Sequence, residues 1–278
     1  MNRIIVETTT IADVPIIIVA PEEAESCPII FHVHGFGGTK KAGVAMGYRL
    51  AAEGMVCVCV DADMHGDRLD PRLTALLEGA ADYVYPRDTG LDSYFELHKI
   101  VKRTGGDVGR LIDHFAADPR VDTGRVGVTG YSMGGFTTYY TAAHDPRVYA
   151  AAALISFPAL AERWEDVIAE SASYEKWADA IASVEAETAE RTAFIRAMDP
   201  YEKLRDFHPR PLLMIQGDLD TDAPKFYTVK LYRELQPLYA DHPDRLALHV
   251  YDHVAHRVTG PMRDDVSAWF KKHLRSRA

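Results

Sequence analysis

The sequence predicts an α/β fold with a mainly parallel central sheet that is flanked by helices. Short apolar runs alternate along the chain with longer segments whose apolar residues recur at helical spacing. Polar, glycine-containing clusters follow four of the apolar runs, at residues 34–38, 61–68, 130–134 and 217–222. Ligands of open α/β sheets bind where the carboxyl ends of the strands meet. The four clusters therefore predict one shared active site.

Composition limits the class of protein and its partners. The 278 residues are 47% hydrophobic, so we expect a single domain over residues 1–278 with a substantial core. The formal net charge of −10 argues against nucleic acid and anionic membranes as partners, because both require a basic face. The three cysteines form no disulfide framework and no C-x-x-C pair. No signal-peptide core and no apolar run of membrane-spanning length is visible, so we expect a cytoplasmic protein.

The first half of the chain predicts five elements and a long loop. Two β-like runs form an opening hairpin, and the next two apolar runs are typical of strands that are buried on both faces. Gly54 is expected to end the helix between those two strands, and Gly105-Gly106 to kink or interrupt the later one. In chain order we expect a hairpin, strand, helix, strand, loop and helix at residues 3–20, 28–33, about 40–53, 56–60, 69–92 and about 93–115.

The second half continues the alternation but is interrupted by an insertion. Residues from about 158 to 206 are rich in Ala and Glu, with aromatic residues at helical spacing, and predict a small helical cap. The cap aromatics either line a pocket or pack the cap onto the domain. Around the cap we expect strands at 126–128, 149–155, 211–216 and 246–251, with helices to about 144, at about 225–238 and at about 260–274.

The segment Gly130-Tyr-Ser-Met-Gly134 lies between a predicted strand and a predicted helix. This is the context in which a G-x-S-x-G pattern carries a nucleophilic serine on a sharp turn. Side chains two residues before and after the serine would collide at such a turn, and glycine removes them. The pattern therefore predicts that Ser132 is a nucleophile.

A serine hydroxyl needs a base within hydrogen-bond reach and an acid that orients the base. In this architecture the chain order is serine, then acid, then histidine. Three carboxylates follow the predicted strand at 211–216 and two histidines follow the one at 246–251: Asp218, Asp220 and Asp222, and His253 and His256. Spacing alone leaves each of them a candidate.

Two backbone N–H groups are expected to stabilise the oxyanion that forms during acyl transfer. One belongs to Met133, directly after the nucleophile at the start of a helix. The other is expected from the early glycine-rich segment His34-Gly-Phe-Gly-Gly38, with Phe36 as the donor. A flexible turn is the alternative interpretation of these glycines.

Together the motifs resemble the α/β-hydrolase superfamily over nearly the whole chain. They are most similar to the branch that contains dienelactone hydrolases, acylaminoacyl- and prolyl-oligopeptidase catalytic domains and small bacterial carboxylesterases. The branch's Gly-x-x-Asp-x-x-Val-Pro segment selects Asp220 as the acid, although Ala223 replaces the valine. Its Tyr-x-Gly-x-x-His segment, counted from Tyr251, selects His256 as the base, although His253 replaces the glycine.

The resemblance also assigns a structural segment. Residues 61–68 resemble the Asp-x-x-x-His-Gly-x-Arg segment that braces the site in family members, which implies bracing roles for Asp63, His65 and Arg68. Two differences from members of this branch narrow the range of activities that we expect. Dienelactone hydrolases proper carry a cysteine where this chain has Ser132, and the oligopeptidases carry a large propeller, whereas only about 30 residues precede the first motif here.

The resemblance implies a carboxylesterase that acts on short acyl esters of small molecules through Ser132, His256 and Asp220, without metal or cofactor. Substrate contacts are expected from Phe36, Phe157 and Trp164, together with further cap residues: Trp177, Phe194 and Met198. A peptidase or amidase with the same triad is the first alternative, and a non-catalytic binding protein on this fold is the second. If the protein forms an oligomer, we expect a homodimer.

Overall fold

The computed structural model describes residues 3–74, 90–172 and 185–275, and an eight-stranded sheet lies at its centre. The strand order is β1-β2-β4-β3-β5-β6-β7-β8. The strands are β1 Ile4–Ile11, β2 Val14–Pro21, β3 Cys27–Val33, β4 Val56–Val60, β5 Val121–Tyr131, β6 Val148–Leu154, β7 Leu212–Gly217 and β8 Leu246–Tyr251. The first two strands form the predicted hairpin, β2 pairs antiparallel with β4, and every later pairing is parallel. The mainly parallel sheet is therefore confirmed.

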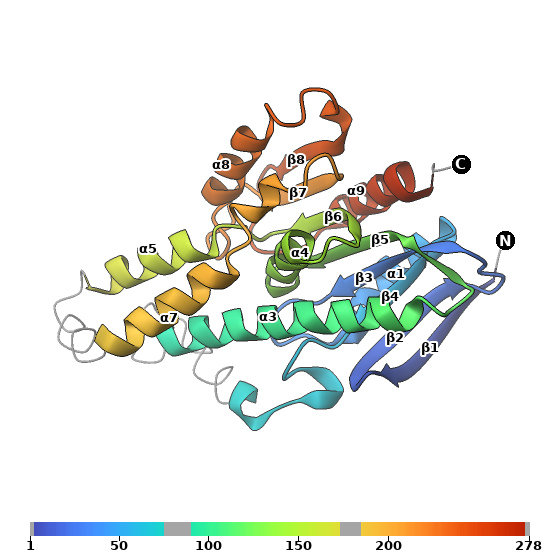
Figure 1. Cartoon of the computed structure of the whole chain (residues 1–278), viewed down its shortest axis with the longest axis horizontal. Coiled ribbons are helices and arrows are strands. Elements are labelled where there is room, and N and C mark those ends of the chain that lie inside the picture. Colours follow the sequence, from blue (N-terminus) through green and yellow to red (C-terminus); the bar gives the residue numbers. More distant parts are fainter. Residues whose placement is uncertain (1–2, 75–89, 173–184, 276–278) are drawn as a thin grey trace.

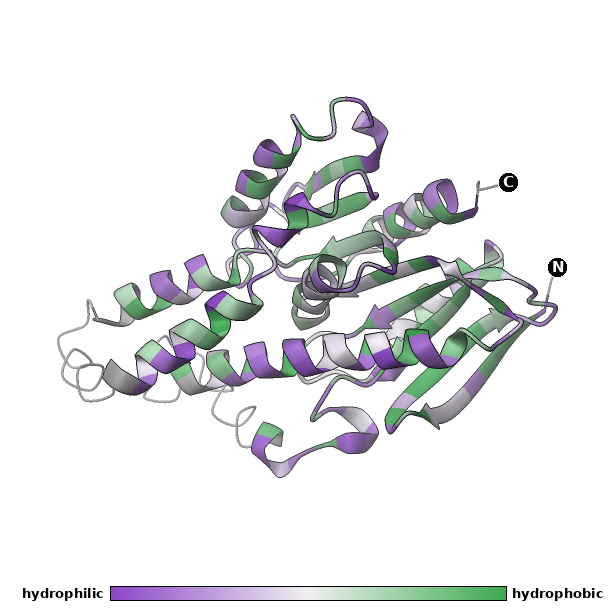
Figure 2. Cartoon of the chain, viewed as in Figure 1, coloured by the Kyte–Doolittle hydropathy of each residue, from purple (hydrophilic) through white to green (hydrophobic). Residues whose placement is uncertain are grey.

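Two hydrophobic cores cover the two faces of the sheet. Alternate residues of a strand point to opposite faces, so Ile16 and Ile18 of β2 enter one core while Ile17 and Val19 enter the other. Every residue of β4 is buried. Figure 2 shows the strands as mostly hydrophobic, whereas the long helix in front of them alternates between hydrophilic and hydrophobic residues.

Helices lie on both faces, as expected for this class. One face carries α3 Gly90–Phe115 and α4 Met133–His144, and the other carries α1 Val44–Ala52 and α9 Gly260–Phe270. Figure 1 shows α3 crossing the front of the sheet, with α1 and α9 behind it. Helix α8 Lys225–Leu235 lies beside β7 and the edge strand β8. Among the helices of the described residues, none is long and apolar enough to cross a membrane.

The predicted interruption of α3 at Gly105-Gly106 is wrong, because α3 is one continuous helix of 26 residues. The reason for glycine here is contact between helices. A Cβ atom on Gly105 would lie 2.4 Å from the ring of Tyr140 on α4, which is closer than two carbons can approach. Gly105 therefore allows α3 and α4 to pack closely. Gly54, in contrast, ends the preceding helical segment with a φ of 79°, as predicted.

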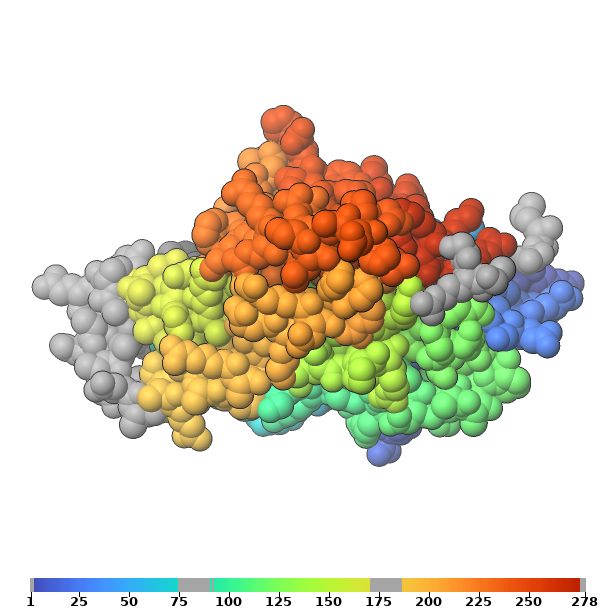
Figure 3. All heavy atoms as spheres, turned by 45° about the horizontal axis from the view of Figure 1, so that its top comes forward, coloured from blue at the N-terminus to red at the C-terminus, as the bar shows by residue number. Residues whose placement is uncertain are grey.

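The chain between β6 and β7 carries α5 Leu160–Ala172 and α7 Glu185–Met198, called the insertion helices here. They stand side by side at one end of the molecule (Figures 1 and 3). A hydrogen bond of 2.7 Å from Trp164 Nε1 to Thr192 Oγ1 joins them. The side chain of Lys230 on α8 pairs with Glu162 on α5. Trp177 and most of the loop expected at 69–92 fall outside the described residues.

Candidate active site

Ser132 stands between the end of β5 and the start of α4, with φ 54° and ψ −121°. A positive φ is costly for a residue other than glycine and persists only where the surroundings impose it. The flanking glycines are required by close packing. A Cβ atom on Gly130 would lie 2.5 Å from the carbonyl oxygen of Val33, and one on Gly134 would lie 2.0 Å from that same oxygen. The serine is thus held on a sharp turn at the carboxyl end of a central strand.

Three side chains from distant parts of the chain meet at this turn. His256 Nε2 lies 2.8 Å from Ser132 Oγ, and His256 Nδ1 lies 2.8 Å from Asp220 Oδ2 and 3.0 Å from Asp220 Oδ1. The Asp220 side chain is fully buried and also accepts hydrogen bonds from the backbone of Asp222 and Ala223. With Nδ1–H donating to the carboxylate, Nε2 is free to accept the serine proton.

The other candidates for acid and base lie elsewhere. Asp218 Oδ1 accepts the backbone N–H of Val254 at 3.1 Å, which ties the loop after β7 to the loop after β8. Asp222 and His253 are exposed. His253 has a φ of 59°, the left-handed conformation that explains why the resembling families place glycine there.

Two backbone N–H groups near Ser132 are available to a ligand. Within the described residues, no acceptor binds the N–H of Phe36 or of Met133. Met133 is the first residue of α4, where the helix dipole favours negative charge. The loop that carries Phe36 turns back on itself, because Gly38 N–H donates to the Gly35 carbonyl at 3.0 Å and Gly37 adopts a φ of 73°.

Two family models match this chain, each over more than half of its length. The prolyl oligopeptidase family matches residues 99–277, and the dienelactone hydrolase family matches residues 14–172. The chain belongs to the α/β-hydrolase superfamily, in the branch of these two families. Both families consist of hydrolases, and this protein is a hydrolase.

Relatives of this α/β-hydrolase cover almost its entire length. A curated relative from Bacillus subtilis (strain 168), named "Putative esterase YitV", is 25% identical over 271 residues, which are 97% of this chain and 99% of the relative. The crystal structure of TT1662 from Thermus thermophilus matches with a TM-score of 0.71 at 18% identity, covering 99% and 100% of the two chains. Acetyl xylan esterase 1 from Thermoanaerobacterium matches with a TM-score of 0.64 at 18% identity, covering 98% and 88%. At these identities the structural likeness establishes the α/β-hydrolase fold alone.

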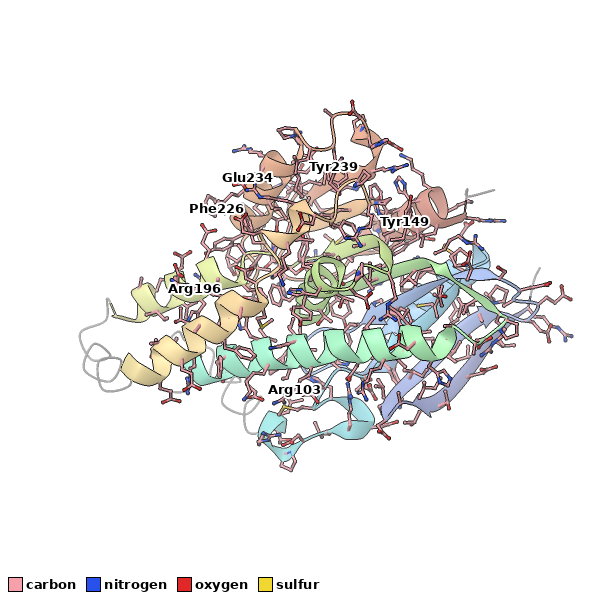
Figure 4. All side chains as sticks on the ribbon, in the orientation of Figure 1. Arg103, Tyr149, Arg196, Phe226, Glu234 and Tyr239 are labelled. Atoms are coloured by element: carbon pink, nitrogen blue, oxygen red, sulfur yellow. The ribbon has the colours of Figure 1, made fainter. Side chains whose placement is uncertain are left out.

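The segment after β4 contacts the loop of Phe36, as a bracing segment should. His65 Nε2 accepts the N–H of Gly37 at 3.1 Å. Arg68 donates to the backbone carbonyls of residues 61 and 62. Arg103 of α3, labelled in Figure 4, donates to Asp63 Oδ2 at 3.0 Å. The contacts of all three residues are compatible with the bracing roles implied by the resemblance.

A buried ion pair beside this segment was not predicted from the sequence. Lys40 Nζ lies 2.6 Å from Asp61 Oδ2, and the exposed fractions of the two side chains are 3% and 0%. The backbone N–H of Lys40 also donates to Asp61 Oδ1 at 2.6 Å. Burial alone would raise the pKa of Asp61, but these hydrogen bonds, and another from the N–H of Asp67, hold its pKa below the usual value. Asp61 was visible as the polar end of an apolar strand, but its partner was not.

The predicted substrate contacts differ in accessibility. Phe36 is half-buried, and its ring meets the ring of His65 edge-on, with the centroids 5.5 Å apart. Phe157 is only 1% exposed and packs against Phe136 and Tyr227. Phe36 is therefore the more accessible of these two aromatic residues.

Trp164 is fully buried at the base of the insertion helices. Its indole ring stacks on Tyr94 of α3 with the centroids 6.1 Å apart, and its N–H is bound to Thr192. In this structure Trp164 joins α3, α5 and α7 through packing. Its role as a substrate contact stays a prediction, as does that of Phe157.

Proposed function

We propose that this hydrolase is a serine carboxylesterase that cleaves short-chain acyl esters of small molecules through an acyl-enzyme. The observation that carries the proposal is the hydrogen-bonded series Ser132–His256–Asp220, next to two backbone N–H groups without acceptors. Such a series supplies a nucleophile, a base and an orienting acid in one place. The esterase names of the Bacillus relative and of the xylan esterase neighbour support an ester as substrate.

In the first step, Ser132 Oγ attacks the ester carbonyl while His256 Nε2 takes the hydroxyl proton. The buried Asp220 carboxylate stabilises the imidazolium that forms and keeps its Nδ1–H pointing toward Oδ2. Negative charge develops on the former carbonyl oxygen. The N–H groups of Phe36 and Met133 would donate to that oxygen, and their orientation is set before the reaction begins.

In the second step, the tetrahedral intermediate expels the alcohol, which takes the proton from His256 Nε2. The acyl group is left as an ester on Ser132. A water molecule then attacks this ester as His256 removes its proton, and the acid leaves with Ser132 restored. His256 alternates between base and acid in both halves of the reaction.

The burial of the predicted aromatic contacts supports a short acyl group. Phe157 and Trp164 have almost no surface that a ligand could reach in this structure. Phe36 retains accessible surface beside the nucleophile loop. We therefore include short acyl groups in the proposal, and we assign the insertion helices the role of a cap.

Replacing the nucleophile tests the proposal. Ser132→Ala should lower the turnover of p-nitrophenyl acetate on the order of a thousandfold or more. The thermal unfolding temperature should stay close to that of the wild type, because only one hydroxyl is removed. Turnover that survives the substitution would overturn the proposal.

The prolyl oligopeptidase family match supports a second candidate, a peptidase or amidase with the same triad. Parallel assays of p-nitrophenyl butyrate and an aminoacyl p-nitroanilide separate the two activities. The proposal expects kcat/KM to be higher for the ester by at least about a hundredfold, a difference of about 2.7 kcal/mol in transition-state stabilisation. Comparable values for the two substrates would favour the peptidase.

A further inference from the structure

Two loops at the site exchange hydrogen bonds through a pair of buried histidines. The oxyanion loop is residues 34–38, and the bracing loop is residues 61–68. His34 of the oxyanion loop accepts the N–H of Ala62 in the bracing loop, with 3.1 Å between its Nε2 and that nitrogen. His65 of the bracing loop accepts the N–H of Gly37 in the oxyanion loop, also at 3.1 Å. The two ring centroids are 5.1 Å apart. Each loop thus supplies the acceptor that satisfies an N–H of the other loop.

These contacts determine the tautomer of both rings. A ring nitrogen that accepts a backbone N–H carries no proton, so the proton of each neutral ring is on Nδ1. In His34 this Nδ1 lies 2.7 Å from the carbonyl oxygen of Gly35. In His65 it lies 2.7 Å from the carbonyl oxygen of Asp63. Each ring therefore accepts from the opposite loop and donates to its own loop.

Both rings are held in the neutral form by their surroundings. Burial lowers the pKa of His34 to about 4 and lowers the pKa of His65. The charged side chains around the pair are of both signs: Asp61 and Asp63 are acidic, and Arg68 is basic. At neutral pH the crossed contacts are consequently intact.

The donor of the oxyanion hole belongs to the peptide that His34 binds. The Gly35 carbonyl and the Phe36 N–H are part of one rigid plane and point in opposite directions. The carbonyl accepts both His34 Nδ1–H and the N–H of Gly38, and the shorter bond from His34 helps to aim the Phe36 N–H. It also polarises the peptide so that this N–H becomes a stronger donor. The bond from Gly37 N–H to His65 fixes the peptide on the other side of Phe36.

We propose that His34 and His65 are positioning residues that aim the Phe36 N–H at the oxyanion, acting as a crossed pair of neutral Nδ1–H imidazoles. This inference rests on the proposed function, because the oxyanion exists only if Ser132 attacks an acyl group. Neither ring touches the reacting atoms. Each acts through a backbone group of the oxyanion loop.

Substitution by asparagine or by glutamine tests the contacts of the two ring nitrogens separately. The amide of Asn reaches the position of Nδ1, whereas the amide of Gln reaches the position of Nε2. His34→Asn keeps the donor to Gly35, and His65→Gln keeps the acceptor for Gly37, so kcat for p-nitrophenyl acetate should fall less than about tenfold. His34→Gln and His65→Asn lose those contacts, so kcat should fall about a hundredfold while KM stays within about threefold. A merely structural role predicts no such crossed preference.

His144 provides the matched control. Its Nδ1 also lies 2.8 Å from a backbone carbonyl oxygen, that of Tyr140, but at the end of α4 that is remote from Ser132. His144→Asn and His144→Gln should both keep kcat within about twofold of the wild type. A loss of kcat in these variants equal to that in His34→Gln would overturn the proposal.

Two further measurements keep the test independent of folding and of the proposed function. Nitrogen-15 NMR of the wild-type imidazoles should show the neutral Nδ1–H tautomer for both His34 and His65 at pH 7. A charged ring or an Nε2–H tautomer in either residue would overturn the pair. Ser132→Ala is run alongside: if it stays active, the proposed function fails. If it is inactive while the four histidine variants show equal kcat values, only the crossed pair fails.

Discussion

A charged pair beside the loops around Ser132 and a charged pair within the insertion helices differ in burial. The loops are fixed by buried contacts, such as the Lys40–Asp61 ion pair with exposed fractions of 3% and 0%. The insertion helices are joined to each other partly by exposed pairs, such as Arg196–Glu165 with exposed fractions of 63% and 49%. Arg196 is labelled in Figure 4. Buried charge pairs tolerate little displacement, whereas exposed pairs contribute little and re-form easily. We therefore expect the buried pair to restrict the loops more than the exposed pair restricts the insertion helices.

The largest effect should come from Asp220, the proposed acid. Asp220→Asn cannot stabilise the imidazolium of His256, so kcat for p-nitrophenyl acetate should fall by about 10³- to 10⁴-fold. Asp218→Asn keeps an oxygen that can accept the N–H of Val254, so its kcat should fall less than about tenfold. Equal modest losses in the two variants would contradict the assignment of Asp220.

Lys40→Met tests the rigidity of the loops. Removing the ammonium leaves Asp61 buried without its partner, which should lower the free energy of unfolding by about 3–5 kcal/mol in urea titrations. The double variant Lys40→Met/Asp61→Asn removes the unpaired charge as well, so it should recover part of the loss. A loss below about 1 kcal/mol in Lys40→Met would show that the pair does not hold the loops.

The base of the insertion should show a pH dependence of stability that comes from Asp199. Its carboxylate accepts the N–H groups of Leu160, Ala161 and Tyr201, but burial raises its pKa to about 6. Because the folded pKa exceeds the unfolded value of about 4, the folded state binds the proton more tightly. This stabilisation is complete below pH 4 and is lost as pH rises through 6, a change of about 2–3 kcal/mol.

Asp199→Asn keeps an acceptor oxygen but cannot ionise, so it should remove that dependence. Urea midpoints at pH 4.5 and pH 7 measure it. The difference in unfolding free energy between variant and wild type should shift in favour of the variant as the pH rises. Identical pH slopes for both proteins would contradict the role of Asp199.

The smallest effect should come from the exposed pair of the insertion helices. Arg196→Gln removes the contact with Glu165, and the free energy of unfolding should change by less than about 0.5 kcal/mol. Thermal unfolding of Arg196→Gln and of Lys40→Met, measured in parallel, compares the contributions of the two ion pairs to stability. A loss as large as that of Lys40→Met would contradict the expected difference between the buried and the exposed pair.

Much of the site could be predicted because its rules are local. A glycine pattern between a strand and a helix locates Ser132 and Met133, and strand ends locate the clusters that hold Asp220 and His256. The choice of Asp220 over Asp218 required a family resemblance, since both follow the same strand. In the structure the two differ by their partners, His256 and the backbone of Val254.

Contacts between residues that are distant in the sequence could not be predicted. Lys40 and Asp61 are 21 residues apart, and His34 and Ala62 are 28 apart, so no periodicity links them. Gly105 shows the same limit. Its sequence context indicates a helix breaker, whereas its structural reason is the ring of Tyr140 on another helix. Such partners are brought together by the packing of different elements. The sequence pattern of a single element does not indicate how it packs against others.

If Ser132 is the nucleophile of this hydrolase, an electrophilic probe of serine hydrolases should label it covalently. Intact-protein mass spectrometry after incubation with a fluorophosphonate probe should show a single adduct, which peptide mapping assigns to Ser132. The adduct should be absent from Ser132→Ala. An unlabelled wild-type protein, or an adduct on another residue, would contradict the claim.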